Sequence, residues 1–208
     1  MVVSKLINAK QEEQKTRFAD QPADEVTHYF LVGYFVVGCA LSVFYKTWLI
    51  GLGVGGLNLL AYYSTRLLLP KSRLYQFVLS ACFGIFMAQF IYQMHGLFEM
   101  HFFAFIGSAL LITHKDWRLQ LPIATVVVVH HAVFGYLQYK GIGEIYFTQV
   151  DYMTLQTFVI HVSLSICIFF ISGLWAHKFH ISTQQLEERN LNIIAGISSA
   201  KRIQLGLL

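Results

Sequence analysis

The chain has 208 residues, of which 56% are hydrophobic and only 12% are charged. A soluble domain of this length could not keep such an apolar composition dissolved, so lipid must be the solvent for most of the chain. The formal net charge of +4 does not indicate nucleic-acid binding, because the basic residues lie in short segments beside apolar runs, where lipid headgroups and membrane topology explain them first. No nucleic-acid-binding motif is present in the sequence.

Six apolar runs follow a polar N-terminal segment that covers residues 1–28. Runs of about twenty apolar residues have the length that a bilayer core of about 30 Å requires, and helices keep the backbone hydrogen-bonded there. The sequence therefore predicts an all-α, polytopic membrane helix bundle with about six transmembrane helices over residues 29–176. The expected helices cover approximately residues 29–46, 48–64, 74–95, 97–114, 119–139 and 152–176.

Lys and Arg are concentrated in alternate connections between these runs. They are frequent in the N-terminal segment, around residues 66–73 and 115–118, and after residue 176, whereas the other connections hold only Lys46 and Lys140. Since basic residues favour the cytoplasmic side, both termini are predicted to be cytoplasmic. The run 48–64 is short and glycine-rich, which gives it the weakest transmembrane signal, although small residues also allow close helix contact.

Residues 177–208 are polar and carry an apolar stripe of helical period. This pattern predicts a cytoplasmic signalling helix that forms a coiled coil in a homodimer. We expect the helix to lead to an output domain in the same full-length chain, of which this sequence would be the N-terminal fragment. The stripe consists of Ile181, Leu186, Ile193, Ile194 and Ile197.

Nine histidines are unusual in so apolar a chain, because polar groups in lipid are costly and usually face the bundle interior for a functional reason. At 1.5 Å per residue, His130 lies about 14 Å inward from Tyr139, and His161 about 15 Å inward from Asp151. The two share a depth in the outer half of the bilayer, and His101 enters from the same side. Imidazoles from three helices can therefore converge, as an intramembrane metal or haem site requires.

Neighbouring residues support an inward-facing polar stripe. On the fifth run, His130 and His131 point about 100° apart, so one can bind a metal while the other takes a supporting role. On the sixth run, four polar residues recur at steps of three and four and are expected to share one face: Thr154, Thr157, His161 and Ser165.

The remaining histidines have simpler interpretations. For His95 and for Glu99, which precedes His101 by two residues, an interfacial position in a short outer loop and a functional role are equally good interpretations. Four other histidines are interpreted as interfacial or solvated: His28, His114, His177 and His180.

Residues 96–138 contain the segments GLFEMHFF, THKDWRLQLPIA and VVVVHHAVFGYLQ in this order. They resemble the multi-pass N-terminal sensor region of some bacterial methyl-accepting chemotaxis proteins and diguanylate cyclases, in which an M-H-F-H element, an RDWR-like turn, a paired HH and a later His recur. The matching positions are 99–102, 116–118, 130–131 and His161. Where that pattern often has a second histidine, this chain has Phe103, which removes one possible ligand.

The resemblance and the histidines together predict a transmembrane sensory input domain of a chemoreceptor-like protein. It is expected to hold a haem b through two imidazoles, drawn from His101, one of His130 and His131, and His161. The alternative is a bare copper, zinc or iron ion held by the same histidines with Glu99. A third interpretation is a small electron-transfer protein of the cytochrome b type, which would have little use for a cytoplasmic tail. We do not expect an enzyme, because no catalytic nucleophile, phosphate-binding loop or acid–base pair is present.

Overall fold

The computed structural model describes residues 2–149 and 154–206, with side chains over 22–149 and 154–205. Every regular element in these residues is a helix, which confirms the all-α prediction, and each expected apolar run is helical. The first helix, however, begins at Val2 and so includes most of the polar segment 1–28, and the last continues without a break from Leu155 to Gly206. Three short 3₁₀ segments join the longer helices: η1 (Phe98–His101), η2 (Ile112–His114) and η3 (Trp117–Leu119). The α-helices are α1 (Val2–Tyr45), α2 (Trp48–Leu68), α3 (Leu74–Gln93), α4 (Phe102–Leu111), α5 (Gln120–Tyr139) and α6 (Leu155–Gly206).

Four helical segments in the described residues are long and apolar enough to cross a bilayer. The chain is therefore a membrane protein. The expected crossings at 48–64 and 97–114 are helical but are not among these four, and the second belongs to a shorter apolar segment, Phe98–His114. The four spans are Pro22–Tyr45, Leu74–Gln93, Trp117–Tyr139 and Leu155–Leu205.

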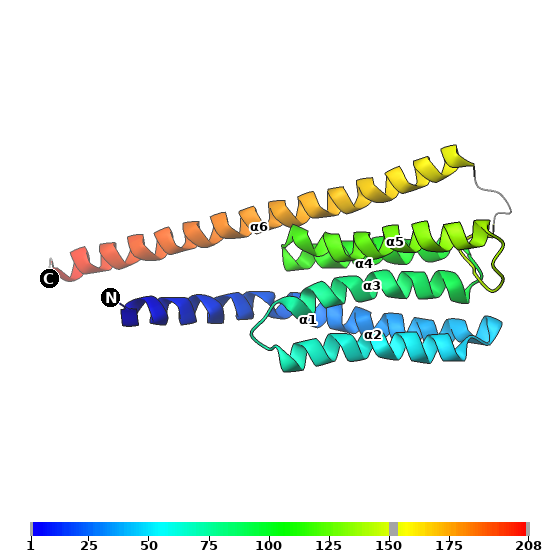
Figure 1. The fold of residues 1–208 in the computed structure, drawn as a ribbon. Helices are drawn as coiled ribbons and strands as arrows, with labels where there is room; N and C mark the ends of the chain where they lie inside the picture. The colour runs from blue at the N-terminus through cyan, green and yellow to red at the C-terminus, as the bar shows by residue number, and fades with distance from the viewer. Residues whose placement is uncertain (1, 150–153, 207–208) are drawn as a thin grey trace.

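The helices lie side by side in a bundle with two distinct ends (Figure 1). One end carries the α1–α2, α3–η1 and α5–α6 connections. It is called the cluster end, because a cluster of histidines described below lies near it. At the other, the tail end, the N-terminal half of α1 and the C-terminal half of α6 both project beyond the bundle (Figure 1). The two chain ends therefore lie on the same side of the bundle. Asp151, the reference point for the depth of His161, falls outside the described residues.

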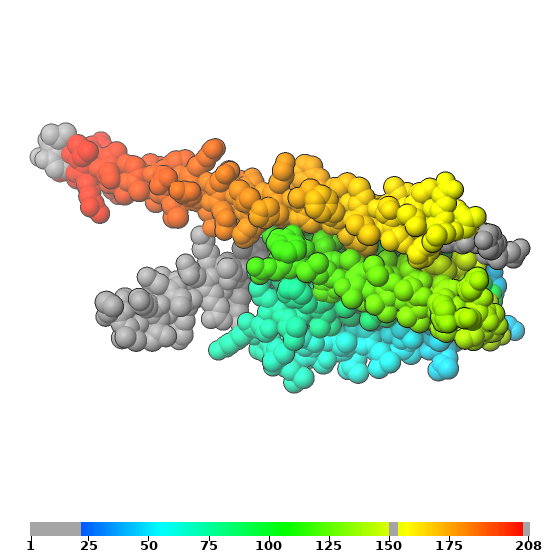
Figure 2. Space-filling view, turned by 45° about the horizontal axis from the view of Figure 1, so that its top comes forward, coloured from blue at the N-terminus to red at the C-terminus, as the bar shows by residue number. Residues whose placement is uncertain are grey.

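The core is built around α3, whose membrane span is 61% buried, against 17% for α6. Its aromatic residues Phe83, Phe86 and Phe90 are fully buried and contact Tyr34 of α1 at ring-centroid distances of 5.0–5.9 Å. Figure 2 shows α6 lying along the outside of the bundle and continuing past it. Because little of α6 is buried, this helix has the fewest packing contacts to resist a movement.

Candidate metal centre

Three histidines from three elements meet near the cluster end of the bundle. His101 ends η1, His131 lies in α5 and His161 in the second turn of α6, and each can offer a ring nitrogen such that all three atoms lie within 4.8 Å of one another. His101 and His131 are buried and His161 is half-buried. These residues, called the three-histidine cluster below, were expected to converge, and the structure brings them together.

Two rings of the cluster are oriented by backbone carbonyls of their own helical turns. The Nδ1 atom of His101 lies 2.8 Å from the carbonyl oxygen of Phe98, and that of His131 lies 2.7 Å from the carbonyl oxygen of Val127. Because a carbonyl oxygen only accepts hydrogen bonds, each Nδ1 must carry the proton, which leaves Nε2 with its lone pair. This is the arrangement in which protein histidines bind metals, with the second nitrogen fixing the tautomer.

The spacing of one pair of these nitrogens matches two ligands of a tetrahedral ion. The Nε2 atoms of His131 and His161 are 3.3 Å apart, and two ligands at about 2.0–2.1 Å from a tetrahedral metal are about 3.4 Å apart. Two axial ligands of a haem lie about 4 Å apart with the porphyrin plane between them. The His131 and His161 rings are instead stacked, with centroids 5.4 Å apart and planes 24° apart. The haem b expectation stays a prediction, and this spacing favours the bare-metal alternative.

The same 3.3 Å separation also fits a hydrogen bond between the two imidazoles. In that case His161 would donate its Nε2 proton to the lone pair of His131, and His101 would have no part in the contact. Metal binding requires all three histidines, whereas this hydrogen bond requires only His131 and His161. Measuring the metal affinity of variants that lack one histidine distinguishes the two interpretations.

His130, the neighbour of His131, is not part of the cluster. Its ring stacks on Phe134 at a centroid distance of 4.6 Å and it is 4% exposed. In the described residues, neither ring nitrogen of His130 has a hydrogen-bond partner. The sequence indicated that only one of the paired histidines could be a ligand, and the packing of α5 gives that position to His131.

Phe147, from the connection between α5 and α6, covers the cluster. Its ring is buried and lies 5.1 Å from the ring of His131 and 6.3 Å from that of His101. Gln138 of α5 holds this connection: its Oε1 accepts hydrogen bonds from the backbone N–H groups of Phe147 (2.7 Å) and Thr148 (3.0 Å), and its Nε2 donates to the carbonyl of Thr148 (2.8 Å). Sequence reasoning missed Phe147 and this role of Gln138. The available signal was that Gln138 follows His131 by seven residues, which places both on one face of α5.

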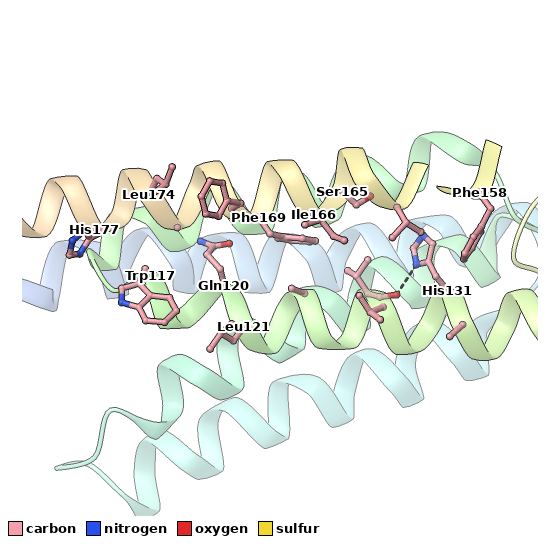
Figure 3. A pocket seen from close by; sticks show the side chains of 17 residues that line it. Trp117, Gln120, Leu121, His131, Phe158, Ser165, Ile166, Phe169, Leu174 and His177 are labelled. Carbon is pink, nitrogen blue, oxygen red and sulfur yellow. Dashed lines mark hydrogen bonds between the residues drawn. The ribbon is translucent and has the colours of Figure 1, made fainter. Parts of the chain in front are cut away.

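An apolar groove of about 640 Å³ runs between α5 and α6 and reaches the cluster at His131. Figure 3 shows His131 at one end of this groove and Trp117 and His177 at the other. The lining between them is almost entirely aliphatic and aromatic, so the groove opens the side of the cluster to apolar surroundings rather than to water.

The other candidate residues lie away from the cluster. Glu99 is exposed and is not in the group of residues that could hold the metal. His95 is stacked between the rings of Tyr45 (3.8 Å) and Tyr146 (3.9 Å). Its backbone φ is +50° and the next residue, Gly96, has φ +80°, so this segment is a tight turn at the cluster end.

His114 was expected to be interfacial or solvated, and it is not solvated. It is 2% exposed, its Nε2 lies 3.3 Å from Thr27 Oγ1, and its Nδ1 lies 3.8 Å from the Asp24 carboxylate. A buried carboxylate needs polar partners; Asp24 also accepts a hydrogen bond from Tyr75 and lies 4.0 Å from Arg66. His28 is half-buried beside Tyr63, and His177 and His180 are exposed.

The polar stripe expected on α6 is only partly inward-facing. Ser165 is buried beneath His161 and donates a hydrogen bond to its carbonyl. Thr154 and Thr157 are exposed. The Thr154 hydroxyl caps the first turn of α6 instead, accepting a hydrogen bond from the backbone N–H of Thr157.

Comparison with known proteins finds no family model that matches this chain, and no curated protein or solved structure that is significantly similar to it.

Proposed function

We propose that this chain is a membrane-embedded sensory input domain that binds one transition-metal ion through the Nε2 atoms of His101, His131 and His161. The observation that carries the proposal is the convergence of three imidazole nitrogens within 4.8 Å, two of them on rings already oriented by carbonyl groups. An all-imidazole site suits copper, zinc or iron. Glu99 is left out of the ligand set, because its side chain is exposed.

A role in signalling is supported by the length and position of α6. This helix has 52 residues, carries His161 near one end, and projects beyond the tail end of the bundle at the other (Figure 1). At 1.5 Å per residue, Gly206 lies about 68 Å from His161 along the helix. An ion that binds the three histidines together would tie α6 to η1 and α5, and so would favour one position of this loosely packed helix over another.

The topology follows from the same proposal. With six crossings, and with the basic connections on the cytoplasmic side of a bacterial inner membrane, both projecting ends would be cytoplasmic and the three-histidine cluster would lie in the outer half of the bilayer. The exposed apolar stripe near the end of α6, which includes Ile193 (59% exposed) and Ile197 (65% exposed), would pair with a second copy in a homodimer.

Metal analysis and an absorption spectrum of the detergent-purified protein test the binding step. We expect one copper, zinc or iron ion per chain and no Soret band, with both air-oxidised and dithionite-reduced samples. His101→Ala should lose the ion and His180→Ala, an exposed histidine of α6, should keep it. A Soret band that shifts on reduction and disappears in His101→Ala would show that the site holds haem b and not a bare ion. A protein with neither metal nor haem would refute the cofactor proposal and leave the His131–His161 hydrogen bond.

The signalling step needs a separate measurement. Spin labels at Thr183 of α6 and at Ser72 of the α2–α3 connection report the distance between α6 and the rest of the bundle at the tail end. Adding the metal should change this distance by about 1–2 Å, the usual size of a helix shift in a switch. An identical distance distribution with and without bound metal would contradict a sensory role for α6 while leaving the metal site intact.

A further inference from the structure

His130 lies beside the three-histidine cluster as a buried imidazole without a hydrogen-bond partner among the described residues. It is 4% exposed, and in the part of the chain that the structure describes both of its ring nitrogens lack a hydrogen bond. A neutral imidazole has one donor and one acceptor, and burying both unpaired is costly. Unsatisfied groups of this kind are rare in proteins, and each requires an explanation, such as a bound water, a bound ion or a functional role.

His130 is not among the histidines whose ring nitrogens converge. It points about 100° away from His131 around α5, because the two are adjacent in a helix. Its ring is stacked on Phe134 with an interplanar angle of 29° and is nearly perpendicular to the His131 ring, at 78° and a centroid distance of 5.5 Å. Its nitrogens are therefore available to a group other than the metal itself.

One aromatic side chain joins His130 to the cluster. The ring of Phe147 lies 5.9 Å from that of His130, 5.1 Å from that of His131 and 6.3 Å from that of His101. Phe147 thus packs against three of the imidazoles, and its ring joins His130 to the cluster under the α5–α6 connection. His130, at 4% exposed, is also shielded there from bulk water.

We infer that the metal carries a fourth, exogenous ligand, and that His130 holds this ligand by a hydrogen bond. The inference rests on the proposed metal site: three protein ligands leave one position of a tetrahedron open, which is the arrangement of metal sites that bind a small molecule. The ligand is a small oxygen- or nitrogen-donor molecule with a hydrogen-bonding atom, such as water, hydroxide or a linear anion. His130 is a positioning residue, since it touches the ligand and not the ion.

Azide binding to the cobalt(II)-loaded full chain tests this inference, because the visible bands of cobalt(II) change when a ligand in the coordination sphere is exchanged. Three proteins are compared: the natural chain, His130→Leu, which cannot form a hydrogen bond, and His130→Asn, which can. Cobalt affinity is measured alongside and should be the same in all three. We expect azide to bind at least about tenfold more weakly to His130→Leu, and within about threefold of the natural affinity to His130→Asn.

Each other outcome has a definite meaning. Equal azide affinity in the natural chain and His130→Leu would overturn the inference, as would cobalt bands that do not respond to azide at all. If both His130 variants lost cobalt as completely as His131→Ala, His130 would serve the metal site itself and the inference would be wrong. If the natural chain bound no metal, the proposed function would fail first; bound metal with azide binding that ignores His130 would refute only the present inference.

Discussion

Replacing Gln138 by leucine should open the connection that covers the metal site. The side chain of Gln138 makes three hydrogen bonds to the backbone of Phe147 and Thr148. At about 0.5–1.5 kcal/mol each, their loss should destabilise the closed connection by about 1.5–4.5 kcal/mol. Since about 1.4 kcal/mol corresponds to a factor of ten, the open population should rise by about 10- to 1,000-fold.

Hydrogen exchange at the backbone amides of Phe147 and Thr148 measures this opening directly, and their rates should rise by the same factor. The amide of Ile142, which donates to the carbonyl of Leu137, is an internal control and should be unaffected. Gln138→Glu keeps the acceptor oxygen but loses the bond donated to Thr148, so it should give an intermediate rate. Unchanged exchange at both amides in Gln138→Leu would show that the glutamine does not hold the connection.

Three further substitutions test the metal site and the packing. His161→Ala should weaken metal affinity at least about 100-fold in a chelator competition, because the loss of a residue that only hydrogen-bonds to a metal ligand already costs 10- to 100-fold. His180→Ala should leave the metal affinity unchanged. Equal metal affinities of the two variants would exclude His161 as a ligand. Gly84→Ala would place a Cβ 2.9 Å from a valine side chain of α5 and should lower the free energy of unfolding by about 1–3 kcal/mol. Gly53→Ala, whose Cβ would have nothing within 4 Å, should be neutral or slightly stabilising. Similar melting temperatures of the two variants would contradict the close packing at Gly84. Gln93→Leu removes hydrogen bonds to three oxygens in and just after α1 and should lower the free energy of thermal unfolding by about 1–3 kcal/mol. A variant at least as stable as the natural chain would show that these hydrogen bonds do not stabilise the fold.

The sequence by itself determined where the apolar helices are, although not that the first of them extends back to Val2 through the polar N-terminal segment. The runs expected at 74–95 and 119–139 became α3 (Leu74–Gln93) and α5 (Gln120–Tyr139), because the length of an apolar segment is a local property that lipid selects directly. It also indicated that His130 and His161 share a depth and that His101 enters from the same side, since depth along a helix depends only on the rise per residue. The expectation that His101 and His161 would meet a histidine of α5 needed no other information.

Only the tertiary structure decided which side chains face one another. His130 and His131 have the same local sequence environment, and the rotation of α5 about its own axis, set by packing against its neighbours, selects His131 for the cluster. The burial of His114 depends on Asp24, which is 90 residues away in the chain. The position of Phe147 depends on a connection with no periodic pattern. Helix rotation and loop path come from contacts between distant residues, and for that reason periodicity and composition could not predict them.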